Sequence, residues 1–135
     1  MHFLFYGTIM RGGAFHHLLK DSQFLGEGSF TGNLYWHRSG IPYAKLDQDG
    51  LVHGEIYEVP EELVPRLDSL EGHPTWYRRV VVKLLEGFAA WVYIYQGSVE
   101  GMEKVPEGRY SIHKPIDAPP SASSASSGPL APTQS

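Results

Sequence analysis

The chain has 135 residues, with 11 Lys and Arg against 15 Asp and Glu, and a formal net charge of −4 when His is neutral. This length predicts one main domain, and the scattered basic residues predict no nucleic-acid partner. The chain has no cysteine, which excludes disulfides, thiolate nucleophiles and cysteine-ligated metals. Without a signal-peptide pattern or an apolar run near the ~20 residues of a membrane span, a soluble cytoplasmic protein with no membrane partner is expected.

The C-terminal segment differs in composition from the rest of the chain. Residues 118–135 are rich in Ser, Ala and Pro and carry neither a charge nor an aromatic ring. Such a segment buries too little apolar surface to offset the entropy of ordering. The sequence therefore predicts a domain over residues 1–117 and a disordered tail over residues 118–135.

The first half of the domain is predicted to be rich in strands. Residues 2–6 form an apolar burst that ends at Gly7, which indicates a buried strand leading into a turn. A short helix is predicted next, over residues 13–20. Further strands are then predicted from β-branched and aromatic residues between glycine-rich breaks, over residues 28–36, 42–46 and 51–59.

The second half is predicted to hold one helix and one hairpin. The helix begins at Pro60, keeps leucines at helical spacing and ends at Gly72. The hairpin joins residues 77–85 to residues 88–95, and the second of these runs is apolar on both faces, which is typical of a central strand. About six strands and two short helices predict an α+β fold, a small mixed β-barrel flanked by short helices.

Glu71 is the candidate acid–base residue. It lies at the predicted C-terminus of the second helix, where the helix dipole disfavours an ionised carboxylate. Screening from water by Leu67, Leu70 and Trp76 would favour the neutral form further, which suits a group that takes and returns a proton. The alternative is a solvated acid at a helix end with no chemical role, and the residues alone leave both open.

The glycine-rich segment after the first predicted strand is a candidate anion-binding loop. Gly7, Gly12 and Gly13 lie between a strand and a helix, an arrangement that presents successive main-chain N–H groups to an anion. The segment matches neither the P-loop nor the GxGxxG pattern. The glycines could equally mark only a tight turn.

Other catalytic constellations find little support. The histidines show no HxH, HxxxH or HExxH spacing, and the neighbours His16 and His17 would point about 100° apart on a helix, so no metal site is expected. Ser39 and Ser69 lack the GxSxG context of an activated serine. Most of the aromatic residues are expected in the core or on a sheet face.

Four segments carry a resemblance when they are taken in order. They are Tyr6-Gly7-Thr8-Ile9-Met10-Arg11-Gly12-Gly13, Val52-His53-Gly54-Glu55-Ile56-Tyr57-Glu58-Val59, Leu67-Asp68-Ser69-Leu70-Glu71-Gly72 through Tyr77-Arg78-Arg79, and Ala90-Trp91-Val92-Tyr93-Ile94-Tyr95. In this order and spacing they resemble the γ-glutamylcyclotransferase-like superfamily, in particular its γ-glutamylamine cyclotransferase and AIG2-like branch, over about residues 2–112. The resemblance implies a small β-barrel with a pocket at its mouth.

The resemblance also implies residues for the site. The family's catalytic glutamate falls on Glu71, and its carboxylate-binding loop falls on Tyr6, Gly7, Thr8 and Ile9. Ile9 replaces the usual leucine, which leaves a main-chain role intact. Gly108-Arg109-Tyr110 replaces the usual aspartate-tryptophan ending and puts the far wall of the pocket in doubt. Residues expected in that wall are Met10, Tyr77 and Tyr110.

The implied reaction is intramolecular aminolysis of a small γ-glutamyl amine or γ-glutamyl amino acid, which releases 5-oxoproline. One carboxylate, Glu71, would act first as base and then as acid, and no metal or other cofactor is implied. Two alternatives stay open. One is a non-catalytic module that binds a small ligand on the same barrel, and the other is a related enzyme that trims a γ-glutamyl group.

Overall fold

The computed structural model describes residues 1–110, and the predicted boundary between residues 117 and 118 lies outside that range. These residues form seven strands, one α-helix and three short 3₁₀-helices. In chain order the elements are β1 His2–Phe5, η1 His16–Leu19, β2 Gln23–Thr31, β3 Asn33–Trp36, β4 Pro42–Lys45, β5 Leu51–Glu58, η2 Glu61–Leu63, α1 Val64–Glu71, β6 Tyr77–Lys83, β7 Ala89–Tyr95 and η3 Pro106–Gly108.

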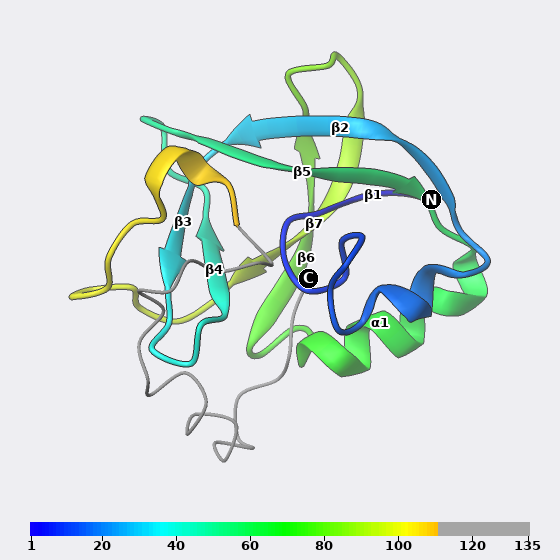
Figure 1. Ribbon diagram of the computed structural model, residues 1–135, viewed down its shortest axis with the longest axis horizontal. Coiled ribbons are helices and arrows are strands. Elements are labelled where there is room, and N and C mark those ends of the chain that lie inside the picture. The colour runs from blue at the N-terminus through cyan, green and yellow to red at the C-terminus, as the bar shows by residue number, and fades with distance from the viewer. Residues whose placement is uncertain (111–135) are drawn as a thin grey trace.

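Five strands form one mixed sheet in the order β2-β5-β1-β7-β6 (Figure 1). β1 runs parallel to β7, and the other neighbouring pairs are antiparallel. β7 therefore lies between β1 and β6, which confirms the central strand predicted from its two apolar faces. β3 and β4 form a separate antiparallel hairpin, and Tyr35 of β3 also makes a single antiparallel bridge to Lys104.

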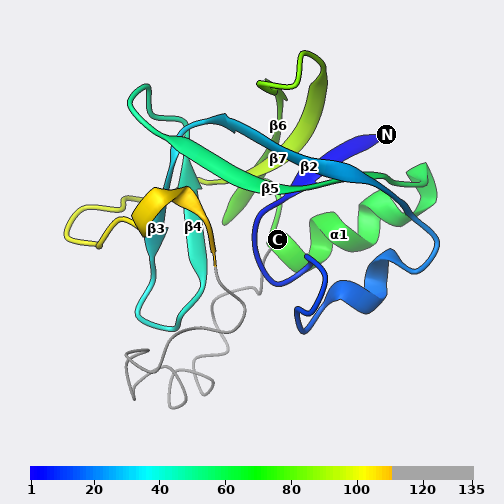
Figure 2. The same cartoon turned by 45° about the horizontal axis from the view of Figure 1, so that its top comes forward.

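The predicted α+β fold with a mixed sheet is confirmed, but the residues that the structure describes form no closed barrel. Within residues 1–110 the outer strands β2 and β6 pair only with β5 and β7, so the sheet stays open (Figure 2). The run predicted as one strand over residues 28–36 is instead divided at Gly32 between β2 and β3. Because the chain leaves the sheet at Gly32, the hairpin β3–β4 stands beside the sheet and does not close it.

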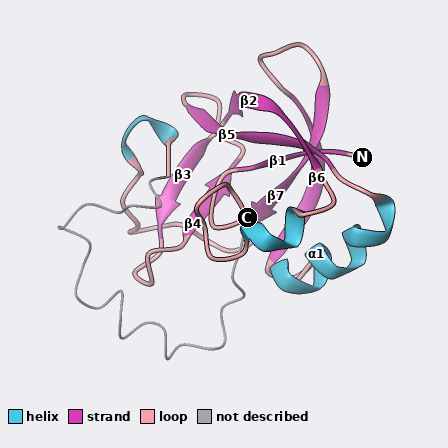
Figure 3. Cartoon of the chain, turned by 45° about the vertical axis from the view of Figure 1, so that its right-hand side comes forward, coloured by secondary structure: helices cyan, strands magenta, loops and turns pink. Residues whose placement is uncertain are grey.

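Apolar side chains cover both faces of the sheet, as the alternation along β1 illustrates. Phe3 and Phe5 belong to one buried cluster, whereas Leu4 and Tyr6 belong to the other. The first cluster includes Val64 and Leu67, so α1 covers this face of the sheet (Figure 3). The second cluster takes in residues of β3, β4 and the segment before η3.

The second helix ends where the sequence predicts, and the first is shorter than predicted. Gly72 caps α1 in the left-handed conformation at φ 68°, which glycine adopts without steric cost. The helix predicted over residues 13–20 is only the 3₁₀-helix η1, because the chain before it is taken up by turns up to Phe15. No helix within residues 1–110 is long and apolar enough to cross a membrane.

Candidate active site

Glu71 is fully buried at the C-terminal end of α1, one residue before the Gly72 cap. The alternative of a solvated helix-end acid is therefore wrong. Burial raises the pKa of Tyr77 well above its ordinary value, and the charges of Tyr6 and Glu71 add to this effect. Burial also raises the pKa of Tyr93, to which the negative charge of Glu71 contributes. Glu71 thus shares one buried region with these tyrosines.

The loop after β1 folds into two successive tight turns. The N–H of Met10 donates to the Gly7 carbonyl at 3.0 Å, and the N–H of Gly13 donates to the Met10 carbonyl at 2.9 Å. The N–H of Phe15 returns to the Thr8 carbonyl at 3.0 Å, and a Cβ atom on Gly13 would overlap that carbonyl oxygen. The turn predicted after the first strand is confirmed, and Gly13 is needed for the close approach of two main-chain segments.

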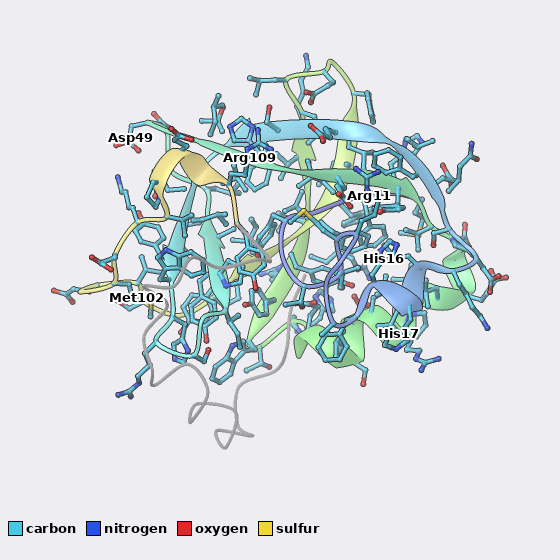
Figure 4. The ribbon with its side chains drawn as sticks, in the orientation of Figure 1. Arg11, His16, His17, Asp49, Met102 and Arg109 are labelled. Atoms are coloured by element: carbon cyan, nitrogen blue, oxygen red, sulfur yellow. The ribbon has the colours of Figure 1, made fainter. Side chains whose placement is uncertain are left out.

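The Ile9 side chain points into the core. It is fully buried and belongs to the same apolar cluster as Leu67 and Tyr77. His16 Nδ1 lies 3.0 Å from the Ile9 carbonyl oxygen, so η1 holds the loop from its far side (Figure 4). The Ile9 side chain therefore anchors the loop to the core.

A chain of hydrogen bonds links the start of this loop to the end of α1. The Tyr6 hydroxyl donates to the Tyr93 carbonyl at 2.6 Å, and the Tyr93 hydroxyl donates to Asp68 Oδ1 at 2.7 Å. Arg79 donates to the same carboxylate through Nε at 2.9 Å and Nη2 at 3.0 Å. Asp68 and Tyr93 lie in motifs that carry the family resemblance but are not among the site residues predicted from the sequence. The available signal was the position of Asp68, one helical turn before Glu71.

Electrostatics set the protonation states of Asp68 and of the two buried tyrosines, Tyr77 and Tyr93. Burial acts to raise the pKa of Asp68, but the hydrogen bonds from Arg79 and Tyr93 hold it below its usual value. Asp68 is therefore ionised at neutral pH. The raised pKa values of Tyr77 and Tyr93 keep both hydroxyls protonated at neutral pH.

The predicted wall residues separate into two places. Met10 and Tyr110 line an open cleft of about 400 Å³, to which the charged residues Arg11, Glu55 and Arg109 also contribute. Arg11 and Arg109 are labelled in Figure 4. Tyr77 does not line this cleft. It is fully buried, and its hydroxyl donates to the Pro42 carbonyl at 3.2 Å.

Metal ligation has no candidate in the part of the chain that the structure describes. Among residues 1–110, no group of three or more His, Asp or Glu side chains is placed to hold a metal ion. His16 and His17 are successive residues of η1, and His16 faces the Ile9 carbonyl (Figure 4).

Comparisons with known proteins agree with one another. A candidate γ-glutamylcyclotransferase of Methanocaldococcus jannaschii is 36% identical over 100 residues, which cover 69% of this chain and 82% of that protein. The structure of an AIG2-like protein from Mus musculus matches with a TM-score of 0.71 and 27% identity, over 84% of this chain and 90% of that one. An uncharacterised protein of Pyrococcus horikoshii matches with a TM-score of 0.70 and 30% identity, over 82% and 89% of the two chains.

The family model described as gamma-glutamyl cyclotransferase, AIG2-like, matches residues 3–112. This match takes in β1, the loop after it, the end of α1 and the strands that carry Arg79 and Tyr93. The chain belongs to the AIG2-like gamma-glutamyl cyclotransferase family.

Proposed function

We propose that this protein releases 5-oxoproline from a small γ-glutamyl amine or γ-glutamyl amino acid, with Glu71 as the general acid and base. The observation that carries the proposal is the complete burial of Glu71 at the end of α1, in a chain of this family. A carboxylate is rarely buried without a function or a charged partner. Here it lies in the last turn of a helix, one residue before the cap.

Elimination among the neighbouring groups also supports Glu71. A base must be able to accept a proton near neutral pH. The Tyr77 and Tyr93 hydroxyls have raised pKa values and remain protonated, so neither can accept one. Asp68 is ionised, but its lowered pKa and its two bonds to Arg79 make it a weak base.

The reaction would proceed within a single substrate molecule. Glu71 takes a proton from the α-amine, whose nitrogen then attacks the γ-carbonyl carbon and closes a five-membered ring. The bond between that carbon and the amide nitrogen breaks, and Glu71 returns the proton to the departing amine. Because nucleophile and electrophile are already joined, the protein mainly has to hold the substrate in a folded, reactive shape.

The loop after β1 would hold the α-carboxylate of the substrate. The proposal assigns this role to Tyr6, Gly7, Thr8 and Ile9, chiefly through main-chain N–H groups. The buried Ile9 side chain supports a main-chain role, and the turns fixed by Gly13 support a rigid loop. Of the wall residues, Tyr77 would face the buried end of the pocket. Met10 and Tyr110 would stand at its outer edge, where they line the cleft.

The test is a screen for 5-oxoproline release from γ-glutamyl amines, γ-glutamyl amino acids and glutathione. We expect turnover of at least one class by the wild-type protein and a loss of about 10²–10⁴-fold in kcat for Glu71→Gln. Release of free glutamate without 5-oxoproline would favour a trimming enzyme of the same family. Ligand binding without turnover across the whole panel would overturn the proposal in favour of a binding module.

A further inference from the structure

We propose that Tyr93, Asp68 and Arg79, here called the helix-end network, are positioning residues that hold Glu71 in place relative to the loop after β1. The inference rests on the proposed function and adds to it three residues that need not touch the substrate. It is carried by the hydrogen bonds that join α1, the helix that ends at Glu71, to β6, to β7 and, through Tyr6, to the loop after β1.

The first step concerns the anchoring of the helix end. Asp68 lies one turn before Glu71, and its carboxylate accepts three hydrogen bonds from β6 and β7. Its main-chain carbonyl accepts the N–H groups of Gly72 and His73, the latter at 2.9 Å. Asp68 therefore fixes the segment that carries Glu71 through both its side chain and its main chain.

Arg79 fixes the same segment at its other end. Its main-chain N–H donates to His73 Nδ1 at 3.1 Å, while its guanidinium binds Asp68 in bidentate geometry. The guanidinium carbon also lies 4.6 Å from the centre of the Trp91 ring, which restricts its movement. Glu71 is thus held between two residues, Asp68 and His73, that are both bound to Arg79.

Tyr93 joins this anchored helix end to the loop. Its hydroxyl donates to Asp68, and its carbonyl accepts the Tyr6 hydroxyl, so both halves of the candidate site meet on one residue. The two contacts can be removed separately, since one uses the side chain of Tyr93 and the other its main chain. Loss of the Tyr93 hydroxyl weakens the anchoring of the helix end that carries Glu71, and loss of the Tyr6 hydroxyl weakens the anchoring of the loop after β1.

The chain offers a matched control in a second network. The Tyr57 hydroxyl donates to Glu55 Oε1 at 2.9 Å, and the same carboxylate binds Arg11 Nε at 3.1 Å. We call Tyr57, Glu55 and Arg11 the loop network. Tyr57 and Tyr93 are both buried, and each donates to a carboxylate that also binds an arginine. Tyr57→Phe and Tyr93→Phe therefore remove hydrogen bonds of the same kind.

The experiment compares the two variants in the full chain by steady-state kinetics and by carbon-13 NMR of the Glu71 carboxyl group. The NMR signal is assigned by its loss in Glu71→Gln. We expect Tyr93→Phe to lower kcat about tenfold to 100-fold, the cost of a misplaced catalytic group, and to leave KM unchanged. The Glu71 signal should shift in Tyr93→Phe and stay in place in Tyr57→Phe, which should keep its kcat. Tyr6→Phe should act on the loop side and raise KM more than it lowers kcat.

The two readouts separate this inference from the proposed function. If the wild type releases no 5-oxoproline, the proposed function fails, and the Glu71 signal alone decides whether the network positions that residue. Equal behaviour of Tyr93→Phe and Tyr57→Phe would overturn the inference. The inference would also be overturned if Tyr93→Phe lowered kcat without shifting the Glu71 signal. The same holds if the wild type is active and Tyr93→Phe shifts the Glu71 signal without lowering kcat.

Discussion

The helix-end network and the loop network use the same chemistry in two settings. In each, a tyrosine hydroxyl and an arginine bind one carboxylate, and the arginine lies over an aromatic ring, Trp91 in one and Phe24 in the other. The helix-end pair Arg79 and Asp68 is only 19% and 20% exposed, whereas Arg11 is 53% exposed beside a 12% exposed Glu55. Partial burial strengthens charged hydrogen bonds, and water weakens them.

The two networks also differ in what they join. In the loop network the tyrosine bond is local, because Tyr57 and Glu55 are alternate residues of β5, whereas Arg11 is 44 residues from the Glu55 that it binds. Asp68 and Tyr93 are 25 residues apart and connect a helix to the centre of the sheet. Similar side-chain groups therefore have different structural consequences, according to which elements they connect and how much water reaches them.

The largest expected effect lies at the residue that the helix-end network supports. Glu71→Gln should lower kcat by about 10²–10⁴-fold, because the amide fills the same space but cannot exchange protons. The measurement is 5-oxoproline release at saturating substrate, with thermal unfolding to confirm that the variant is folded. A folded variant that keeps more than about a tenth of the wild-type kcat would rule out acid–base catalysis by Glu71.

A smaller effect is expected from replacing the arginine of each network, Arg79 or Arg11, by lysine. Arg79→Lys loses the bidentate bond to Asp68 and should cost about 1–2 kcal/mol of unfolding free energy, with a fall in kcat of about tenfold. Arg11→Lys should change both quantities little, since Arg11 is exposed and water screens its pair. Urea unfolding and kinetics measure the difference, and equal losses in the two variants would remove the distinction between the networks.

A third prediction concerns the stability of the folded protein at low pH. The folded-state pKa of Asp68 is lower than its usual value, so its ionised form stabilises the folded protein. That contribution is present above about pH 4 and is lost as pH falls through the lower folded-state pKa. Asp68→Asn lacks this contribution, so its melting temperature should lie below that of the wild type at neutral pH. The difference between the two melting temperatures should become smaller as the pH is lowered. Tyr57→Phe leaves Asp68 in place and serves as control. If the difference in melting temperature between the wild type and Asp68→Asn does not change with pH, the charge of Asp68 does not stabilise the fold.

The smallest effect is expected from Ile9→Leu. The two side chains have the same volume, and Ile9 is buried in the core, so the change should cost less than about 1.5 kcal/mol. Substrate affinity should not change, because the loop is expected to bind through its main chain. A large change in KM with little change in melting temperature would show that the Ile9 side chain contacts the substrate.

Much of the fold followed from local patterns. The apolar burst in residues 2–6 and the two apolar faces of residues 88–95 placed β1 and β7 correctly, and Gly72 ended the helix as predicted. The prediction of a helix over residues 13–20 was wrong in its extent, because apolar spacing does not reveal the turns that the chain makes up to Phe15. Closure of the barrel was mistaken because strand patterns do not say which edges pair.

The sequence by itself determined most of the strands, the helix end, the family and the identity of Glu71 as the candidate acid–base residue. These depend on spacings of a few residues and on short motifs that are visible in the chain. Only the tertiary structure decided that Glu71 is fully buried, that the sheet is open, and that Tyr93 joins the loop to the helix. The Tyr6 hydroxyl and the Tyr93 carbonyl are 87 residues apart along the chain. They meet because β1 and β7 are neighbours in the sheet, and strand order depends on the packing of the whole domain.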